Sequence, residues 1–182
     1  MKLFLFVLGG LVVFLVALIG IVGIWGLTIP RRHSATSTAV YRVPPDSIWA
    51  ALDDWAASPA WRTDVKRVVR LPDRNGHEVW DQIADEGHWP LEIVEKVRPA
   101  RLVAVVADSS QGFGGTWTYT IAPEGAGARV TIREDGFVDN PIFRFLARHV
   151  FGLYATQQGY LRGLGKRFGE TVTPERVAEP AR

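Results

Sequence analysis

The chain has 182 residues, 47% of them hydrophobic and 22% charged, a composition that excludes both a disordered chain and a protein with many membrane spans. Lysine and arginine number 21 against 19 aspartate and glutamate residues, without the clustered basic face that nucleic-acid binders carry, so no nucleic-acid partner is expected. The chain contains no cysteine, which excludes a disulfide scaffold, a zinc ribbon and a thiol nucleophile.

The first predicted element is a membrane-spanning helix. From Leu3 to Ile29 the chain carries no charge, and a helix of that length, about 40 Å, exceeds the roughly 30 Å of a bilayer's hydrocarbon core. Trp25 lies where an indole can sit among lipid headgroups, and Arg31 and Arg32 follow as a polar boundary. A cleaved signal peptide is the alternative, but its apolar core is normally only about 7–15 residues long. We therefore expect an uncleaved single-pass anchor.

Three parts follow from this division of the chain: an anchor at residues 1–30, a globular domain at 34–170 and a polar tail at 171–182. The charges on either side of the anchor indicate its orientation, since Lys2 precedes it while Arg31 and Arg32 follow it. Positively charged flanks tend to remain on the cytoplasmic side of a membrane. The count therefore favours a cytoplasmic position for the globular domain.

Small residues recur at every third position near the end of the predicted anchor, at Ala17, Gly20, Gly23 and Gly26. Small residues at such spacing can let two membrane helices approach closely. Glycine is also common in membrane helices generally. We interpret the spacing as ordinary composition, with a homodimer through this helix as the alternative.

Strands dominate the first hundred residues of the globular domain; a short helix that Asp46 or Ser47 can cap, and a second short turn from Ala60, lie between the first strand and the second. Alternating apolar residues and turn signals such as Asn75-Gly76 mark their limits. The connections are short, which is typical of an antiparallel meander of six or seven strands. The predicted strands are residues 36–43, 65–71, 77–84, 89–97, 102–107, 116–121 and 128–138.

A long C-terminal helix is predicted from Asn140, which can cap it, and Pro141, which is favourable at a first helical position. Beyond them, side chains spaced three and four apart form one helix face that continues to about residue 170. We expect this face to cover the concave side of the sheet, since no other predicted element is long enough. Its members are Leu146, Val150, Leu153, Gln157, Leu161, Leu164 and Phe168.

The sequence contains no recognisable catalytic or metal-binding constellation. Asp85 and Glu86 are adjacent on a predicted strand, so their side chains point to opposite faces and do not form a ready dyad. The glycine-rich residues 112–115 lead into a strand, without the helix N-terminus that would bind a phosphate. The histidines lack the spacing of metal ligands: His33, His77, His88 and His149. We therefore predict no metal, no cofactor and no catalytic residue.

Four segments follow one another in a recognisable order: residues 43–52 (VPPDSIWAAL), 61–65 (WRTDV), 114–119 (GGTWTY) and 138–142 (VDNPI). Together they resemble the START-like superfamily, which includes the polyketide cyclase/dehydrase and lipid-transport proteins. The resemblance spans nearly all of residues 36–170. It implies an α+β helix-grip fold, in which a curved antiparallel sheet wraps around a long C-terminal helix and leaves a cavity between them.

The aromatic residues of the globular domain suit an apolar cavity with few polar groups. Gln157 is the one clearly polar member of the predicted helix face. A buried amide must be hydrogen-bonded, so Gln157 either bonds a sheet carbonyl or faces a cavity filled by water or ligand. The candidate ligand-binding residues are Trp80, Trp89, Trp117, Tyr119, Leu153, Tyr154, Gln157 and Leu161.

Function is therefore first interpreted as binding or carrying of a hydrophobic small molecule (a lipid, isoprenoid, quinone or polyketide-like ring) by a membrane-anchored protein. The anchor would hold the cavity within reach of ligands dissolved in the bilayer. Two alternatives remain open. One is an enzyme of the cyclase, aromatase or dehydratase type, for which Gln157, the tyrosines and Glu134 are the available polar groups. The other is a partner-binding module without a ligand.

Overall fold

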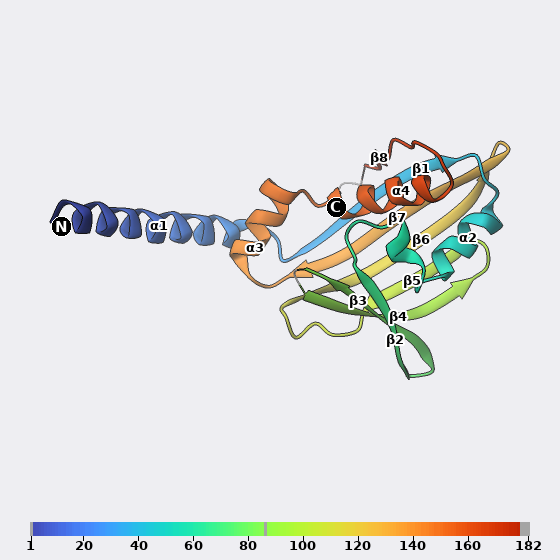
Figure 1. Ribbon diagram of the computed structural model, residues 1–182, viewed down its shortest axis with the longest axis horizontal. Helices are drawn as coiled ribbons and strands as arrows, with labels where there is room; N and C mark the ends of the chain where they lie inside the picture. Colours follow the sequence, from blue (N-terminus) through green and yellow to red (C-terminus); the bar gives the residue numbers. More distant parts are fainter. Residues whose placement is uncertain (1, 86, 179–182) are drawn as a thin grey trace.

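The computed structural model describes residues 2–85 and 87–178, apart from the side chains of Leu3 and Leu5, as an apolar helix joined to an α+β domain (Figure 1). The described strands form one antiparallel sheet in the order β2-β3-β4-β5-β6-β7-β1-β8, which confirms the predicted fold class. These strands are β1 (Arg32–Tyr41), β2 (Arg67–Arg74), β3 (His77–Ala84), β4 (Gly87–Val97), β5 (Arg101–Val106), β6 (Phe113–Glu124), β7 (Gly127–Val138) and β8 (Glu175–Arg176).

Local sequence explains most of the sheet. Asn75 and Gly76 both have positive φ, 51° and 81°, and connect β2 to β3 by the tight turn that an Asn-Gly pair favours. The strand beyond the predicted six or seven is β8, in which Arg176 and Glu175 pair with Ser37 and Thr38 of β1. Part of the predicted polar tail therefore joins the sheet edge, while residues 179–182 lie outside the described residues.

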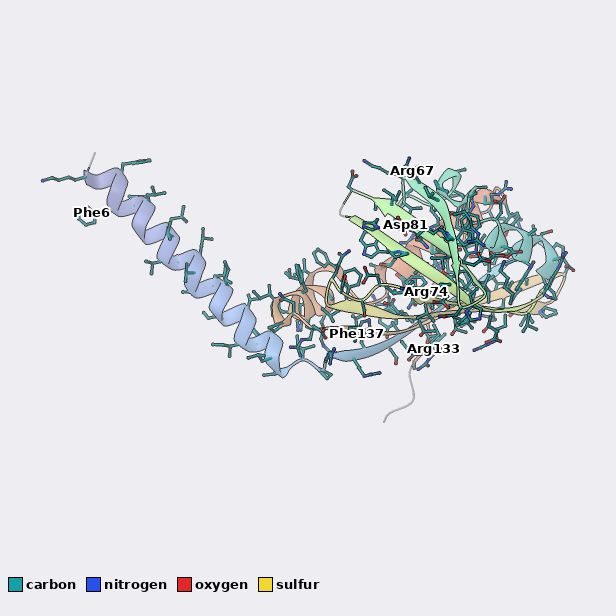
Figure 2. The ribbon with its side chains drawn as sticks, turned by 90° about the horizontal axis from the view of Figure 1, so that it is seen from below. Phe6, Arg67, Arg74, Asp81, Arg133 and Phe137 are labelled. Atoms are coloured by element: carbon teal, nitrogen blue, oxygen red, sulfur yellow. The ribbon has the colours of Figure 1, made fainter. Side chains whose placement is uncertain are left out.

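Helix α1 (Lys2–Thr28) contains the segment Phe6–Thr28, with a mean hydropathy of 2.9 and enough length to cross a membrane. Figure 2 shows α1 projecting away from the domain, with Phe6 near its free end. The side chains along most of α1 are exposed, as expected for a helix that has no protein core around it. The helix ends just before Pro30, which cannot continue the backbone hydrogen bonding.

Two helices lie over one face of the curved sheet, which we call the inner face: α2 (Pro45–Asp53) and α4 (Ala155–Arg167) (Figure 1). A short turn, η1 (Ser58–Ala60), follows α2. Leu161 and Leu164 of α4 are fully buried in the core between this helix and the sheet. The hydroxyl of Tyr41 on β1 donates to the Leu161 carbonyl at 2.8 Å, and this bond fixes α4 against the sheet.

The predicted continuous helix is interrupted. The structure has α3 (Pro141–Leu146), a π-helical turn η2 (Ala147–Phe151) and then, after a break, α4. Gly152 adopts a φ of 80°, a left-handed conformation that glycine reaches without steric cost and that ends a helix. Val150 is consequently 62% exposed, so the expectation that it faces the sheet is wrong. The inward face predicted from Leu146 onward holds only from Gln157.

Helix α3 packs instead against the C-terminal end of α1 (Figure 1). A Cβ at Gly26 would lie 1.9 Å from the carbonyl oxygen of Pro141, so only glycine permits this approach. The rings of Trp25 and Phe145 meet with centroids 5.6 Å apart. A Cβ at Gly23 would be in ordinary contact with Ile142, whereas one at Gly20 would meet no atom within 4 Å. The contact within the chain therefore accounts for Gly26, and the dimer alternative is not needed to explain it.

Candidate functional site

The strand register places the tryptophans of the central strands on the inner face. Trp117 of β6 lies opposite Ala104 of β5, and Trp80 of β3 lies opposite Leu91 of β4. Opposed residues in an antiparallel sheet share a face, and both partners belong to the core under α2 and α4. Trp80 and Trp117 pack against this core but remain only half-buried. The inner face therefore presents two large indoles that the helices do not cover completely.

We call the end of the inner face at which α1 is attached the open end, because the indoles toward it are only half-buried. There β1 begins at Arg32 opposite Phe137, close to the end of β7, and Gly87 opens β4 opposite Ala84. Trp89, the third half-buried indole, lies two residues inside this edge and opposite Gln82. The chain connectivity thus puts three indoles of the sheet between the core and the end that carries the apolar helix.

A cavity of about 350 Å³ lies at this same end of the sheet. Val106, Gly115 and His33 contribute to its lining. Gly115 is two residues before Trp117 on β6, and side chains two apart on a strand point to the same face. The volume is within the range of about 300–1,000 Å³ that small-molecule sites occupy. Most of the other lining residues, among them Ser34, Thr116 and Asp135, alternate along their strands with the inner-face residues, so the cavity lies at this end of the sheet chiefly on its outer face.

Gln157 joins α4 to β1 and leaves half of its amide unused. Its side chain is fully buried, and its Nε2 donates to the carbonyl oxygen of Ala35 at 2.9 Å. Among the described residues, no donor reaches its Oε1. Ala35 lies opposite Glu134, which lies opposite Trp117, so Gln157 borders the same row of the sheet. One half of the amide is structural, and the other is free to accept a hydrogen bond from a ligand or a water molecule.

Glu134 provides a second polar group on the inner face. Its Oε1 lies 3.5 Å from Nε2 of His33, and both side chains are about four-fifths buried. The sequence alone indicates no partner for His33, because the pairing of β1 with β7 that brings it to Glu134 spans about a hundred residues. A carboxylate and an imidazole thus stand beside Trp117 at the open end.

Between α4 and the sheet, aromatic rings fill the interior. Trp61 meets Tyr160 edge-on at 5.1 Å between centroids, Tyr160 meets Tyr119 at 5.4 Å, and Tyr119 meets Trp117 at 6.2 Å. Burial raises the pKa of Tyr160 to about 12 and also raises the pKa of Tyr119. Both hydroxyls are therefore neutral hydrogen-bonding groups at physiological pH. The row of four rings links the open end to the opposite end of α4.

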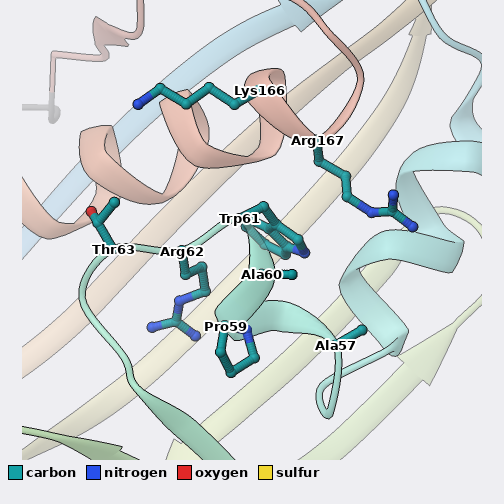
Figure 3. Close-up of a pocket in the computed structure, with 8 residues that line it drawn as sticks. All are labelled: Ala57, Pro59, Ala60, Trp61, Arg62, Thr63, Lys166 and Arg167. Carbon is teal, nitrogen blue, oxygen red and sulfur yellow. The ribbon is translucent and has the colours of Figure 1, made fainter.

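At that opposite end, a cavity of about 710 Å³ opens between the loop after α2 and the last turn of α4 (Figure 3). Its lining includes Arg62, Lys166 and Arg167. Arg62 is only 8% exposed and its guanidinium donates to both carboxylate oxygens of Asp64, at 3.1 and 2.5 Å. Burial by itself would lower the pKa of Arg62, but the hydrogen bonds to Asp64 outweigh it and the net shift is upward. This cavity is basic, and none of the predicted ligand-binding residues lines it.

The predicted ligand-binding residues thus separate into groups. Trp80, Trp89 and Trp117 lie half-buried on the inner face, and Gln157 borders them. Tyr119 and Leu161 are core residues. The remaining two residues lie in the break between η2 and α4. The Tyr154 ring centroid is 4.7 Å from Cζ of Arg176, and Leu153 lines a small cavity near α1.

For the described residues, no group of three or more histidine, aspartate and glutamate side chains is arranged to hold a metal ion. The sequence predicts that Asp85 and Glu86 point to opposite faces of a strand. Glu86 lies outside the described residues, so only Asp85 can be placed. Asp85 is exposed and paired with Lys66. The chemistry available at the open end is therefore apolar contact from the indoles with hydrogen bonding from Gln157, Glu134 and His33.

Comparison with known proteins agrees with this geometry. The family model described as polyketide cyclase/dehydrase and lipid transport matches residues 32–168. A START superfamily protein from Mycobacterium smegmatis is 16% identical, with a TM-score of 0.60 over 74% of this chain and 96% of its own. The Zhui aromatase/cyclase from Streptomyces sp. R1128 is 13% identical, with a TM-score of 0.59 over 75% and 96%.

A third solved structure is a di-domain protein, the aromatase/cyclase StfQ from the steffimycin biosynthetic pathway. It is 16% identical, with a TM-score of 0.60 over 76% of this chain, which spans only 52% of StfQ. No curated protein matches the chain significantly in sequence. At these identities, the solved structures establish a shared fold and leave the ligand to be argued from the site.

Proposed function

The chain belongs to the polyketide cyclase/dehydrase and lipid transport family, and on that premise we propose that it binds a hydrophobic small molecule at the open end of its inner face. The observation that carries the proposal is the half-burial of Trp80 and Trp117 on a face whose neighbouring residues are buried. Indoles provide a large apolar contact area, and leaving them partly open to water is unfavourable unless a ligand covers them.

The position of this site suits a ligand taken from a bilayer. The apolar helix α1 leads directly into β1 at the end of the sheet that holds Trp89 and the cavity. With α1 spanning the membrane, this end of the domain is held close to the lipid surface, and the basic cavity beyond Arg62 is turned away from it. Lipids, isoprenoids, quinones and polyketide-like rings are the classes that combine an apolar body with the few polar groups that Gln157, Glu134 and His33 can satisfy.

We further propose that α1 is an uncleaved anchor and that the domain lies in the cytoplasm. The protein should resist extraction by alkaline carbonate, and a C-terminal reporter active only in the cytoplasm should be functional. Replacing Arg31 and Arg32 with glutamine should weaken that orientation, because these residues carry most of the positive bias. Replacing Lys66 and Arg67 with glutamine is the matched control, since these charges lie far along the chain from α1. A mature N-terminus beyond Ile29 would contradict the anchor.

The ligand site is tested with Gln157→Leu in the full chain, purified in mild detergent. Loss of the donor to the Ala35 carbonyl should cost about 1–3 kcal/mol of unfolding free energy. If Oε1 serves a ligand, retention of a decyl ubiquinone probe through gel filtration should also fall, as quantified by mass spectrometry. Gln158→Leu, one position along the same helix and not fully buried, is the control for both measurements.

The outcomes separate the three functional interpretations. If Gln157→Leu lowers the free energy of unfolding but leaves retention of the probe unchanged, the assignment of Gln157 to the ligand site is contradicted. A hydrophobic molecule that co-purifies with the protein and is recovered chemically unchanged supports binding or carriage. Turnover of an added aromatic ring precursor that is lost in Glu134→Gln would instead establish an enzyme of the cyclase, aromatase or dehydratase type. The pair formed by Glu134 and His33 is the observation that favours this alternative. If no small molecule is bound or retained, the result favours the third interpretation, a module that binds a partner and has no ligand.

A further inference from the structure

A smaller cavity, of about 150 Å³, lies where α1 meets the globular domain. Four arginines contribute to its lining: Arg31, Arg32, Arg144 and Arg148. In the part of the chain that the structure describes, no carboxylate lines it. The volume is below the roughly 300–1,000 Å³ of sites that enclose a whole small molecule. It is suited to a compact anionic group.

The positive charge of this cavity is only partly neutralised within the protein. Arg31 pairs with Asp139, which lies beside the cavity. Arg144 donates from Nη1 to the Ile29 carbonyl at 2.8 Å, yet its Nε is buried and has no acceptor among the described residues. The structure records no side-chain hydrogen bond or ion pair for Arg32 and Arg148 within the described ranges. Among the described residues, the four guanidinium groups therefore have one carboxylate partner, Asp139, and the buried Nε–H of Arg144 has no acceptor.

Apolar side chains surround this charged cavity on the side of α1. On α3 and η2, Phe143 is 59% exposed, Val150 62% and Phe151 65%, which is unusual for three large apolar residues within a segment of nine. Phe143 belongs to α3, which packs on α1 at Gly26, while Val150 and Phe151 belong to the turn whose His149 lies against Trp25, with ring centroids 6.1 Å apart. Exposed apolar residues next to arginines are typical of segments that lie at a membrane surface. The junction therefore combines a cationic cavity with an apolar surface at the same level.

The geometry points to a binding site for the phosphate group of an anionic membrane lipid, held by Arg32, Arg144 and Arg148, with the acyl chains against the apolar side chains of α3 and η2. Guanidinium groups bind phosphate oxygens through paired, charge-assisted hydrogen bonds, and the unused Nε of Arg144 supplies one more donor. Basic cavities beside membrane helices suit lipid headgroups. The inference rests on the proposed membrane span of α1. It gives α3 and η2 a role: together with the lipid they fix how the domain stands on the bilayer.

The test uses the full chain in dodecyl maltoside micelles, washed free of co-purified lipid. Binding of dimyristoyl phosphatidylglycerol and of dimyristoyl phosphatidylcholine is measured by native mass spectrometry, with inorganic phosphate as a competitor. We expect phosphatidylglycerol to bind at least tenfold more tightly than phosphatidylcholine. The double variant Arg32→Gln with Arg148→Gln should lose about tenfold or more in affinity, because each arginine near an anionic lipid contributes separately.

The matched control is Arg162→Gln with Arg167→Gln, which removes the same charge from two exposed positions on α4, toward the end opposite α1. Equal affinity for the two lipids, or an equal loss in the control, would overturn the inference. Displacement of phosphatidylglycerol by inorganic phosphate would assign the site to free phosphate and overturn the lipid source. These readouts do not involve the decyl ubiquinone probe, and carbonate extraction tests the membrane span separately. A failure here is therefore distinguishable from a failure of the proposed function.

Discussion

Replacing Leu161 with alanine is expected to lower the free energy of unfolding by about 2–5 kcal/mol, the range for large-to-small changes in a packed core. Leu161 is fully buried between α4 and the sheet, and the Tyr41 hydroxyl fixes its backbone, so the site has little freedom to collapse around the cavity. Val150→Ala is the matched control, since it occupies the same face of the helix that the sequence predicts. It should change stability by no more than about 0.5 kcal/mol, because Val150 is exposed.

Denaturant unfolding of the full chain in detergent micelles, followed by the near-ultraviolet circular dichroism of the buried aromatic residues, measures both variants. Equal losses for Leu161→Ala and Val150→Ala would restore a continuous helix across Gly152 and contradict the observed break. A loss confined to Leu161 supports two helical segments with separate partners, the sheet for α4 and α1 for α3.

This comparison also shows why the sequence predicted the sheet better than the helix. Strand limits are set by local signals, and residues 77–84 were predicted with the bounds that β3 has. The spacing of apolar residues from Leu146 to Leu164 fits one helix, although the helix is broken at Gly152, between the helical segments η2 and α4. Periodicity identifies which residues share a face but not which partner covers that face. The partner of α3 is α1, which lies more than a hundred residues earlier in the chain.

The candidate site was likewise predictable where local sequence signals determine it and not where long-range pairing does. Strand alternation and aromatic content indicated Trp80, Trp89 and Trp117, whose inner-face positions follow from the register. The contact of His33 with Glu134 depends on the pairing of β1 with β7, and no short-range pattern reports it. The same limit applies to the arginines around the small cavity, because Arg32 and Arg148 are brought together only when α3 docks on α1. Long-range docking decided these features, and local sequence decided the rest.

Gly26→Leu should separate α3 from α1 and has the largest expected effect on the junction. A side chain at this position would meet the Pro141 carbonyl oxygen at 1.9 Å from its first carbon, a distance that cannot be accommodated without moving the α3 backbone. Insertion of α1 should persist, because leucine favours the membrane interior. Gly20→Leu makes the same change where a Cβ would meet nothing within 4 Å, and it is the matched control.

The absence of native cysteine makes this separation measurable by a disulfide between Gly23→Cys and Ile142→Cys, since no other thiol can react. A Cβ at Gly23 would lie 3.8 Å from Cγ1 of Ile142, which places two cysteines near bonding range. Adding Gly26→Leu should reduce disulfide formation about tenfold, the effect of losing about 1.4 kcal/mol of contact energy, while Gly20→Leu should leave it unchanged. Undiminished cross-linking in Gly26→Leu would show that α3 holds its place without the glycine contact. A loss of cross-linking together with weaker binding of phosphatidylglycerol would show that the docking of α3 on α1 is what brings the arginines of the small cavity together.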